Sequence, residues 1–141
     1  NKCDWNKLNY NNWIKLLYDF PQFANKCDKW NEFNGDDWNI LLSKQPQFAD
    51  KCDKWNEFNE VDWSWLLSYH PQFIYRCDKL DEFNEEEWCD LLAEQPLLIK
   101  YCNTSIITEK GKAKLLAKHP DLATYFPETE KQAKNNQPEL F

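Results

Sequence analysis

The chain has 141 residues but only two glycines, Gly35 and Gly111, and no methionine. A glycine-rich phosphate-binding loop needs several glycines close together, so such loops are excluded. No zinc-protease HExxH pattern and no nucleophile elbow occurs. No apolar run approaches the ~20 residues that cross a bilayer, and no signal peptide is visible. We therefore expect neither an enzyme nor a membrane protein.

Basic residues are fewer than acidic ones, 17 against 24, and the net charge is −7. Residues 1–102 contain 11 Lys and Arg against 19 Asp and Glu. An acidic surface repels phosphate backbones, which argues against direct nucleic-acid binding. The charge is compatible with a protein partner that has a basic surface.

Six cysteines are present, but no CxxC pair occurs. Four of them follow one another at intervals of 25 residues: Cys27, Cys52, Cys77 and Cys102. Equivalent residues of stacked helices lie roughly 8–10 Å apart, whereas a disulfide needs Cα atoms about 4.4–6.8 Å apart. We therefore expect buried structural thiols, no metal or other cofactor, and a reducing, cytoplasmic compartment. Cys89 lies outside this series and is a candidate for a more accessible thiol.

The dominant feature is a tandem repeat of 25 residues. It places a Trp at 13, 38, 63 and 88 and a Pro at 21, 46, 71 and 96. A unit this short cannot bury its own apolar face and must stack on its copies. The repeat predicts an all-α, short right-handed α-solenoid of about five units. We expect a single domain over residues 1–126, with repeats at about 3–26, 27–51, 52–76 and 77–101, a degenerate cap repeat at 102–126 and a polar tail at 127–141.

The third repeat illustrates the local structure that we expect. Asn59 is a suitable N-cap, and Asp62 follows three residues later, as in a capping box. Phe58 and Trp63 flank this cap as a hydrophobic staple. Pro71 ends a helix of about ten residues and opens a second helix, which is short or partly 3-10 because the period leaves little room.

The last repeat departs from this pattern. Thr108 replaces the capping Asn, Lys112 stands at the Trp position and Phe126 at the Cys position. Terminal repeats of solenoids differ from internal ones because their outer face meets water. We therefore interpret residues 102–126 as a capping repeat.

A capped helix, a Leu-Leu pair, a Pro and a second short helix recur in each unit, including TEKGKAKLLAKHPDLATYF at 108–126. This order is similar to that of the leucine-rich repeat variant family, which implies a right-handed solenoid of alternating α and 3-10 helices. The stretch QPQFADKCDKW at 45–55 resembles Trp-rich tandem repeats of bacterial and phage proteins. Both resemblances imply a fold and an interaction role, and no catalytic residues carry over.

Positions at which the repeats differ are the candidates for function, since the repeated positions maintain stacking. The third repeat is enriched in aromatic and apolar exceptions. The candidate partner-binding residues are Trp65, Tyr69, Ile40, Ile74, Tyr75 and His70. Trp65 and Tyr69 are i, i+4 neighbours on the side away from the leucine pair. Two alternatives stay open: Trp65 and Ile74 fill gaps between repeats, and His70 is a hydrogen-bonding residue at a helix end.

Two functions are compatible with these residues. The first is a non-enzymatic protein–protein interaction module that binds a protein or peptide on one helix face through aromatic anchors. The second is a small acidic inhibitor, a nucleic-acid-mimicking decoy of a nuclease or defence protein of the phage anti-defence type. The oligomeric state is not indicated by the sequence.

Overall fold

The computed structural model describes residues 4–126, and the regular structure in that range is entirely α-helical or 3-10 helical, with no strand. The chain divides into two compact units, Asn1–Arg76 (unit 1) and Cys77–Phe141 (unit 2). The single domain expected over residues 1–126 stays a prediction, and the expected tail 127–141 lies outside the described residues. Between residues 4 and 126, no helix combines the length and the apolar character needed to cross a bilayer.

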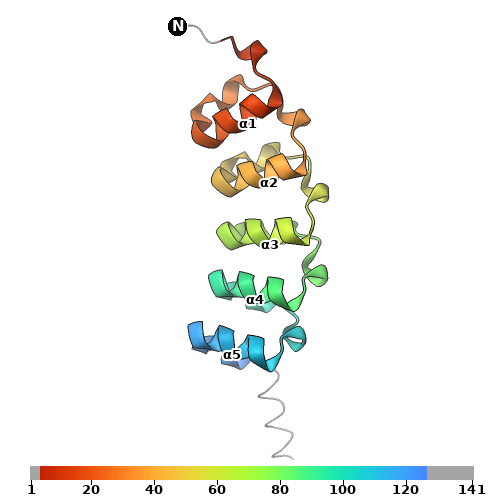
Figure 1. Cartoon of the computed structure of the whole chain (residues 1–141), viewed down its shortest axis with the longest axis vertical. Helices are drawn as coiled ribbons and strands as arrows, with labels where there is room; N and C mark the ends of the chain where they lie inside the picture. Colours follow the sequence, from red (N-terminus) through yellow and green to blue (C-terminus); the bar gives the residue numbers. More distant parts are fainter. Residues whose placement is uncertain (1–3, 127–141) are drawn as a thin grey trace, which may run out of the picture. The chain divides into compact units, whose positions relative to one another are not determined.

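Every repeat contains a three-residue 3-10 helix, an α-helix of ten residues and a six-residue 3-10 helix, as Figure 1 shows for the α-helices. The α-helices are α1 (Tyr10–Asp19), α2 (Gly35–Lys44) and α3 (Glu60–Tyr69) in unit 1, and α4 (Glu85–Glu94) and α5 (Glu109–Lys118) in unit 2. The long 3-10 helices are η2 (Pro21–Lys26), η4 (Pro46–Lys51), η6 (Pro71–Arg76), η8 (Pro96–Tyr101) and η10 (Pro120–Tyr125). The short ones are η1 (Trp5–Lys7), η3 (Trp30–Glu32), η5 (Trp55–Glu57), η7 (Leu80–Glu82) and η9 (Thr104–Ile106).

Consecutive α-helices of a unit pack against one another. In unit 1, α1 contacts α2 and α2 contacts α3; in unit 2, α4 contacts α5. Each α-helix also contacts the long 3-10 helix that follows it. This stacking of like repeats makes the fold an all-α, solenoid-like tandem repeat, as the 25-residue period predicts.

The predicted capping boxes are confirmed in the first four repeats. At α3, Asp62 N–H donates to Asn59 Oδ1 at 2.8 Å, and Asn59 N–H donates to Asp62 Oδ2 at 3.1 Å. Equivalent pairs begin the other three helices: Asn9–Asn12, Asn34–Asp37 and Asn84–Glu87. These bonds satisfy N–H groups that have no intrahelical partner, and so they set where each α-helix begins.

The repeated prolines end the α-helices. The residue before Pro71, His70, has φ −137° and ψ 76°, outside the α region, because the proline ring crowds an α conformation there. Pro71 then opens η6, where its fixed φ and missing N–H are tolerated. The short second helix expected from the period is thus a 3-10 helix.

The core follows the repeat. Exposure is 0–2 % at the repeated tryptophans Trp13, Trp38, Trp63 and Trp88. The predicted staple places Phe58 against Trp63, with ring centroids 5.3 Å apart. A second tryptophan, Trp55, stacks on Trp63 at 5.7 Å, and Trp30 stacks on Trp38 in the same way. The indoles of Trp38 and Trp63 are therefore enclosed by aromatic side chains of their own repeats.

Side chains that precede the prolines tie neighbouring repeats together. Gln45 Nε2 donates to the Tyr18 carbonyl at 2.8 Å, and His119 Nε2 lies 2.9 Å from the Ala93 carbonyl. These carbonyls lie near the ends of α1 and α4, where backbone acceptors have no partner within the helix. The residue before each of these prolines therefore helps to hold neighbouring repeats together.

The last repeat keeps the helix order with altered packing. Lys112, at the Trp position, is 7 % exposed, and its Nζ lies 3.4 Å from Glu109 Oε1 and 5.9 Å from the Phe126 ring centroid. Phe126, at the Cys position, is 2 % exposed. A phenyl ring at the Cys position thus lies against the lysine that replaces the indole.

Candidate interaction surface

Helix α3 carries core residues on one side and large exposed side chains on the other. Trp63, Leu66 and Leu67 are fully buried. Trp65 is 43 % exposed and Tyr69 is 56 % exposed. Trp65 is therefore a surface residue that lies two positions from a buried tryptophan.

Trp65 and Tyr69 contact each other as the i, i+4 spacing predicts. Their ring centroids are 5.7 Å apart at an interplanar angle of 77°, an edge-to-face arrangement. The Trp65 carbonyl accepts a 2.6 Å hydrogen bond from Ser68 Oγ within the same helix. The two rings are thus held on a capped, regular helix and do not depend on a loop for their position.

Val61 extends the pair along the helix and was missed in the sequence analysis. It is 60 % exposed and lies four residues before Trp65. The signal was available, because the other repeats have Asn11, Asp36 and Glu86 at this position. We call Val61, Trp65 and Tyr69, at i, i+4 and i+8 of α3, the α3 stripe.

Ile40 lies at the position of α2 that matches Trp65 of α3, and it is 44 % exposed. The two helices pack against each other, so Ile40 and the α3 stripe belong to adjacent helices of unit 1. Lys44 stands at the position that matches Tyr69, and its Nζ lies 5.2 Å from the ring centroid of Tyr18 on α1. The exposed apolar residues at these matching positions therefore lie on α2 and α3.

The remaining predicted residues lie elsewhere. Tyr75 on η6 is 75 % exposed, and the guanidinium of Arg76 lies 5.5 Å from its ring centroid. Ile74 is 8 % exposed, so its side chain fills the core, the gap-filling alternative. His70 is half-buried: its Nε2 lies 2.8 Å from the Ser43 carbonyl, and its ring packs against Phe73 at 6.1 Å. His70 thus occupies the same scaffold position as Gln45 and His119.

The thiols have weak nucleophilic character. Cys27, Cys52, Cys77, Cys89 and Cys102 are free and half-buried. Burial raises the pKa of Cys52 and of Cys77 to about 11, with a further increase from the carboxylates Asp53 and Asp78. Burial also raises the pKa of Cys89, as do Glu85 and Asp90. Cys89 is half-buried like the repeated cysteines, and its expected greater accessibility stays a prediction.

The repeated cysteines are half-buried because they lie at connections. Each follows the last residue of a long 3-10 helix, and the Sγ atoms of Cys27 and Cys77 accept hydrogen bonds from Lys29 N–H and Lys79 N–H at 3.4 Å. Buried thiols were expected from the sequence. The acceptor role of the sulfur atoms was not, because the sequence carries no signal for it.

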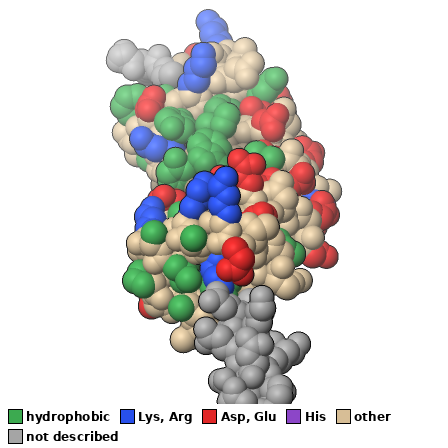
Figure 2. Space-filling view, turned by 60° about the horizontal axis from the view of Figure 1, so that its bottom comes forward, with side chains coloured by type: hydrophobic (Ala, Val, Ile, Leu, Met, Phe, Trp, Pro, Cys, Tyr) green, Lys and Arg blue, Asp and Glu red, His purple; other side chains and the backbone are tan. Residues whose placement is uncertain are grey.

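The described residues hold no group of three or more His, Cys, Asp or Glu side chains placed to bind a metal ion. The surface offers apolar contacts with charged side chains around them, and Figure 2 shows such hydrophobic patches among Lys, Arg, Asp and Glu on the face in view. The exposed aromatic side chains of this surface can contact another molecule and become buried in the interface. A scan against protein-family models and searches of curated proteins and of solved structures found no match to this chain.

Proposed function

We propose that this chain is a non-enzymatic protein-interaction module that binds a protein or peptide through the α3 stripe and Ile40. The observation that carries the proposal is the run of three exposed apolar side chains at i, i+4 and i+8 on one capped helix. Exposed aromatic residues of this kind are the side chains most often found at binding hot spots. The similarity to leucine-rich repeat variant proteins and to Trp-rich bacterial and phage repeats supports a binding role.

The partner that this proposal favours has a basic surface. Glu60 and Asp62 lie in the first turn of α3, next to Val61, and Asp36 and Asp37 lie in the first turn of α2. Acidic side chains at one end of an apolar surface attract a partner that has Lys or Arg beside its own apolar side chains. Charge then contributes mainly to the association rate, and the aromatic anchors to the lifetime of the complex.

The experiment compares two variants that each truncate one exposed apolar side chain. Trp65→Ala removes the centre of the α3 stripe, and Leu97→Ala truncates a residue of unit 2 that is 84 % exposed. A partner is isolated on the immobilised full chain from a lysate of the source organism, and its dissociation constant is measured for all three proteins. We expect Trp65→Ala to weaken binding at least tenfold, about 1.4 kcal/mol or more, and Leu97→Ala to leave it unchanged. Equal affinity of the Trp65 variant would contradict the proposal.

A second function is favoured by the distribution of acidic residues. Residues 77–101 contain eight Asp and Glu against two Lys, a net charge of −6. A decoy that mimics nucleic acid would bind a nuclease or defence protein through such carboxylates. Salt dependence separates the two functions: decoy binding is lost when the ionic strength rises from about 0.1 to 0.5 M, whereas binding through aromatic anchors persists.

A further inference from the structure

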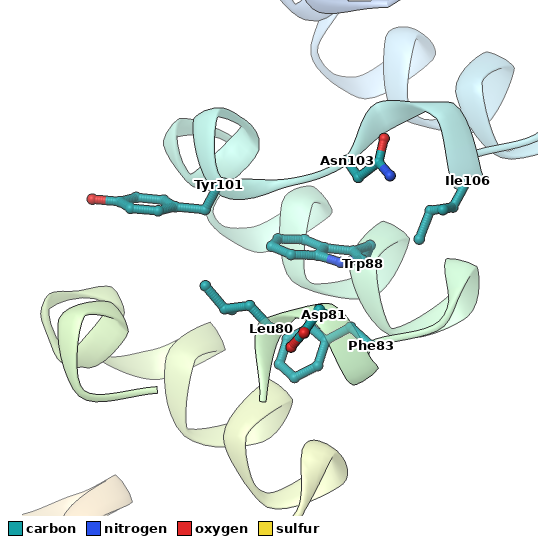
Figure 3. A pocket seen from close by; sticks show the side chains of 7 residues that line it. All are labelled: Leu80, Asp81, Phe83, Trp88, Tyr101, Asn103 and Ile106. Carbon is teal, nitrogen blue, oxygen red and sulfur yellow. The ribbon is translucent and has the colours of Figure 1, made fainter. Parts of the chain in front are cut away.

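Unit 2 has a pocket of about 290 Å³ over the indole of Trp88. Its lining residues come from the connections before α4 and α5, from α4 and from η8: Leu80, Asp81, Phe83, Trp88, Tyr101, Asn103 and Ile106. Figure 3 shows the Trp88 indole at the centre, with Leu80, Asp81 and Phe83 on one side and Asn103 on the other. The volume lies just below the ~300–1,000 Å³ of small-molecule sites, which suits a single side chain.

The other repeats show what normally fills this place. In the second repeat Trp30 stacks on Trp38, with ring centroids 5.7 Å apart and an interplanar angle of 16°. In the third repeat Trp55 stacks on Trp63 at 5.7 Å and 14°. The fourth repeat has Leu80 where these outer tryptophans stand. The pocket therefore opens where an indole is missing above Trp88.

The neighbours of that missing indole are otherwise retained. Trp30 contacts Phe33 edge-on at 5.8 Å, and Trp55 contacts Phe58 in the same way at 5.6 Å. Phe83 stands at the matching position and lines the pocket. A flat aromatic ring that entered the pocket would meet the face of Trp88 and the edge of Phe83, the two contacts that the outer tryptophans make.

The position of the cation over the outer tryptophan also differs in the fourth repeat. Lys51 Nζ lies 5.5 Å from the Trp30 ring centroid, and the Arg76 guanidinium lies 4.8 Å from that of Trp55. At the matching position the fourth repeat has Tyr101, which is 45 % exposed and lines the pocket. The fourth repeat thus lacks the outer indole and has no cation at the matching position. Its neighbouring Lys100 has its Nζ 5.6 Å from the Tyr101 ring centroid instead.

The surroundings of the pocket are acidic. Asp81 lines it, and Asp78 lies on the same connection. Glu82 on that connection pairs with Lys79 at 3.9 Å, and residues 77–101 carry a net charge of −6. Such a site attracts a positively charged ligand. The acidic surroundings of the pocket therefore suit a ligand that supplies the missing Lys or Arg, and the shape of the pocket suits a ligand that supplies the missing indole.

We propose that this pocket binds an aromatic side chain, tryptophan above all, that a basic protein partner carries next to Lys or Arg. The partner's ring stacks on Trp88, and its cation replaces the one that Lys51 and Arg76 provide in the second and third repeats. The proposal does not depend on the α3 stripe, which lies in unit 1.

The test uses the full chain and the peptide acetyl-Lys-Trp-Lys-amide, with acetyl-Lys-Ala-Lys-amide and acetyl-Glu-Trp-Glu-amide as controls. Binding is followed by NMR through the Trp88 indole N–H and the methyl groups of Leu80 and Ile106. We expect saturable shifts at these groups with a dissociation constant on the order of 1 mM, a value typical of so small a ligand. The Ala peptide should produce no shifts, and the Glu peptide should bind at least threefold more weakly.

Two substitutions of Leu80 localise the binding. Leu80→Trp supplies the missing indole from the chain itself and should weaken the Lys-Trp-Lys peptide at least tenfold. Leu80→Ala leaves the pocket open and should retain binding of the Lys-Trp-Lys peptide. A loss of binding in Leu80→Trp alone is then caused by the added indole and not by the loss of the leucine. Leu97→Trp adds an indole at a residue 84 % exposed and is the matched control, expected to bind like the unchanged protein.

Four results would overturn the proposal. The first is the absence of shifts at Trp88 up to several millimolar peptide, and the second is equal binding by the Leu80→Trp variant. The third is contact between the Trp88 pocket and residues 127–141 in the peptide-free chain, which would make this chain its own ligand. The fourth is self-association that protects the pocket, which would make a second copy the occupant.

Discussion

The indole N–H groups of Trp13, Trp38 and Trp63 are buried and have no hydrogen-bond partner among the described residues. An unsatisfied buried donor costs about 1–3 kcal/mol. Burying the ~150–250 Å² of a large aromatic side chain contributes roughly 4–6 kcal/mol at ~25 cal/mol per Å². The free energy gained by burying the apolar area therefore exceeds the cost of the missing hydrogen bond, and the repeated tryptophan stabilises the core by packing.

The thiols provide a prediction at the scale of the residue. Because burial raises the pKa of Cys52 to about 11, little of it is thiolate near pH 8. We expect iodoacetamide to alkylate Cys52 roughly 100-fold more slowly in the folded chain than in urea, since only the thiolate reacts. Peptide mapping by mass spectrometry measures both rates. Equal rates in the folded and unfolded chains would contradict the burial of this thiol.

Side-chain burial was predictable where the repeat specifies it and less so elsewhere. Trp63 could be assigned to the core because it recurs at one position. For Trp65 the sequence left open whether it fills a gap between repeats or lies on the surface, and in the structure it is 43 % exposed. Ile74 and Tyr75 are adjacent exceptions that the sequence could not separate, yet one is 8 % and the other 75 % exposed. A 3-10 helix turns about 120° per residue, so which of two neighbours faces the core depends on the phase of that short helix.

At the scale of the element, each α-helix is delimited by local signals. The Asn caps and the prolines lie at fixed positions of the repeat, and the structure confirms both ends of the helices that they predict. The short 3-10 helices, such as Trp30–Glu32, were not predicted. Their caps Lys29, Lys54 and Lys79 make no capping hydrogen bond through their side chains, so this signal is absent from the sequence.

The first and last connections are one residue shorter and use a different cap. In them, Asn6 N–H and Ser105 N–H donate to the side chains of Asp4 and Asn103, each at 3.2 Å. In the longer connections a cysteine Sγ accepts from Lys29 or Lys79 instead. Loss of one residue is thus compatible with the fold because an Asp or Asn side chain replaces the sulfur as the acceptor.

The capping boxes lead to a prediction about helix stability. Asn59→Ala removes the acceptor of the Asp62 N–H and should lower the free energy of unfolding by about 1 kcal/mol. Asn56→Ala is the matched control, because Asn56 is an exposed asparagine of the adjoining η5 helix and is no N-cap. Urea unfolding followed by circular dichroism measures both. An equal loss of unfolding free energy in the two variants would show that the capping hydrogen bond of Asn59 does not stabilise α3.

The start of α5 leads to a prediction about pH. The Glu85 carboxylate accepts hydrogen bonds from Thr108 Oγ1 at 2.6 Å and from Thr108 N–H at 2.8 Å, and these bonds lower the pKa of Glu85. A carboxyl with a lowered pKa in the folded state stabilises the fold above its unfolded pKa, and this stabilisation is lost as the pH falls through the folded value. Stability should therefore decrease on acidification below about pH 4.5.

Glu85→Gln should remove this part of the acid dependence, since a neutral amide cannot titrate. Glu86→Gln, which removes a charge from the same first turn of α4, serves as the control. Urea unfolding of both variants between about pH 3 and pH 6 gives the comparison. An unchanged acid slope in the Glu85 variant would show that this carboxylate does not couple to folding.

At the scale of the whole molecule, the repeated residues and the residues proposed to bind a partner occupy different positions. The repeated residues cap helices, fill cores and bond to neighbouring repeats, as Gln45 does to Tyr18 and His70 to Ser43. The exceptions Val61, Trp65, Tyr69 and Ile40 are exposed. The pocket over Trp88 arises from a further exception, Leu80, whose importance becomes visible only when the stacked tryptophans of the other repeats are seen in place.

The most direct test of this division compares two tryptophans of one helix. The free energy of unfolding is measured in urea for the full chain, Trp63→Ala and Trp65→Ala. Trp63→Ala should lose about 3–5 kcal/mol, the usual cost of deleting a buried aromatic side chain. Trp65→Ala should lose only about 0.5–1.5 kcal/mol, since its half-exposed ring gives up mainly the edge-to-face contact with Tyr69. A loss of several kcal/mol for Trp65→Ala would show that this residue belongs to the core and would contradict the assignment of the α3 stripe to binding.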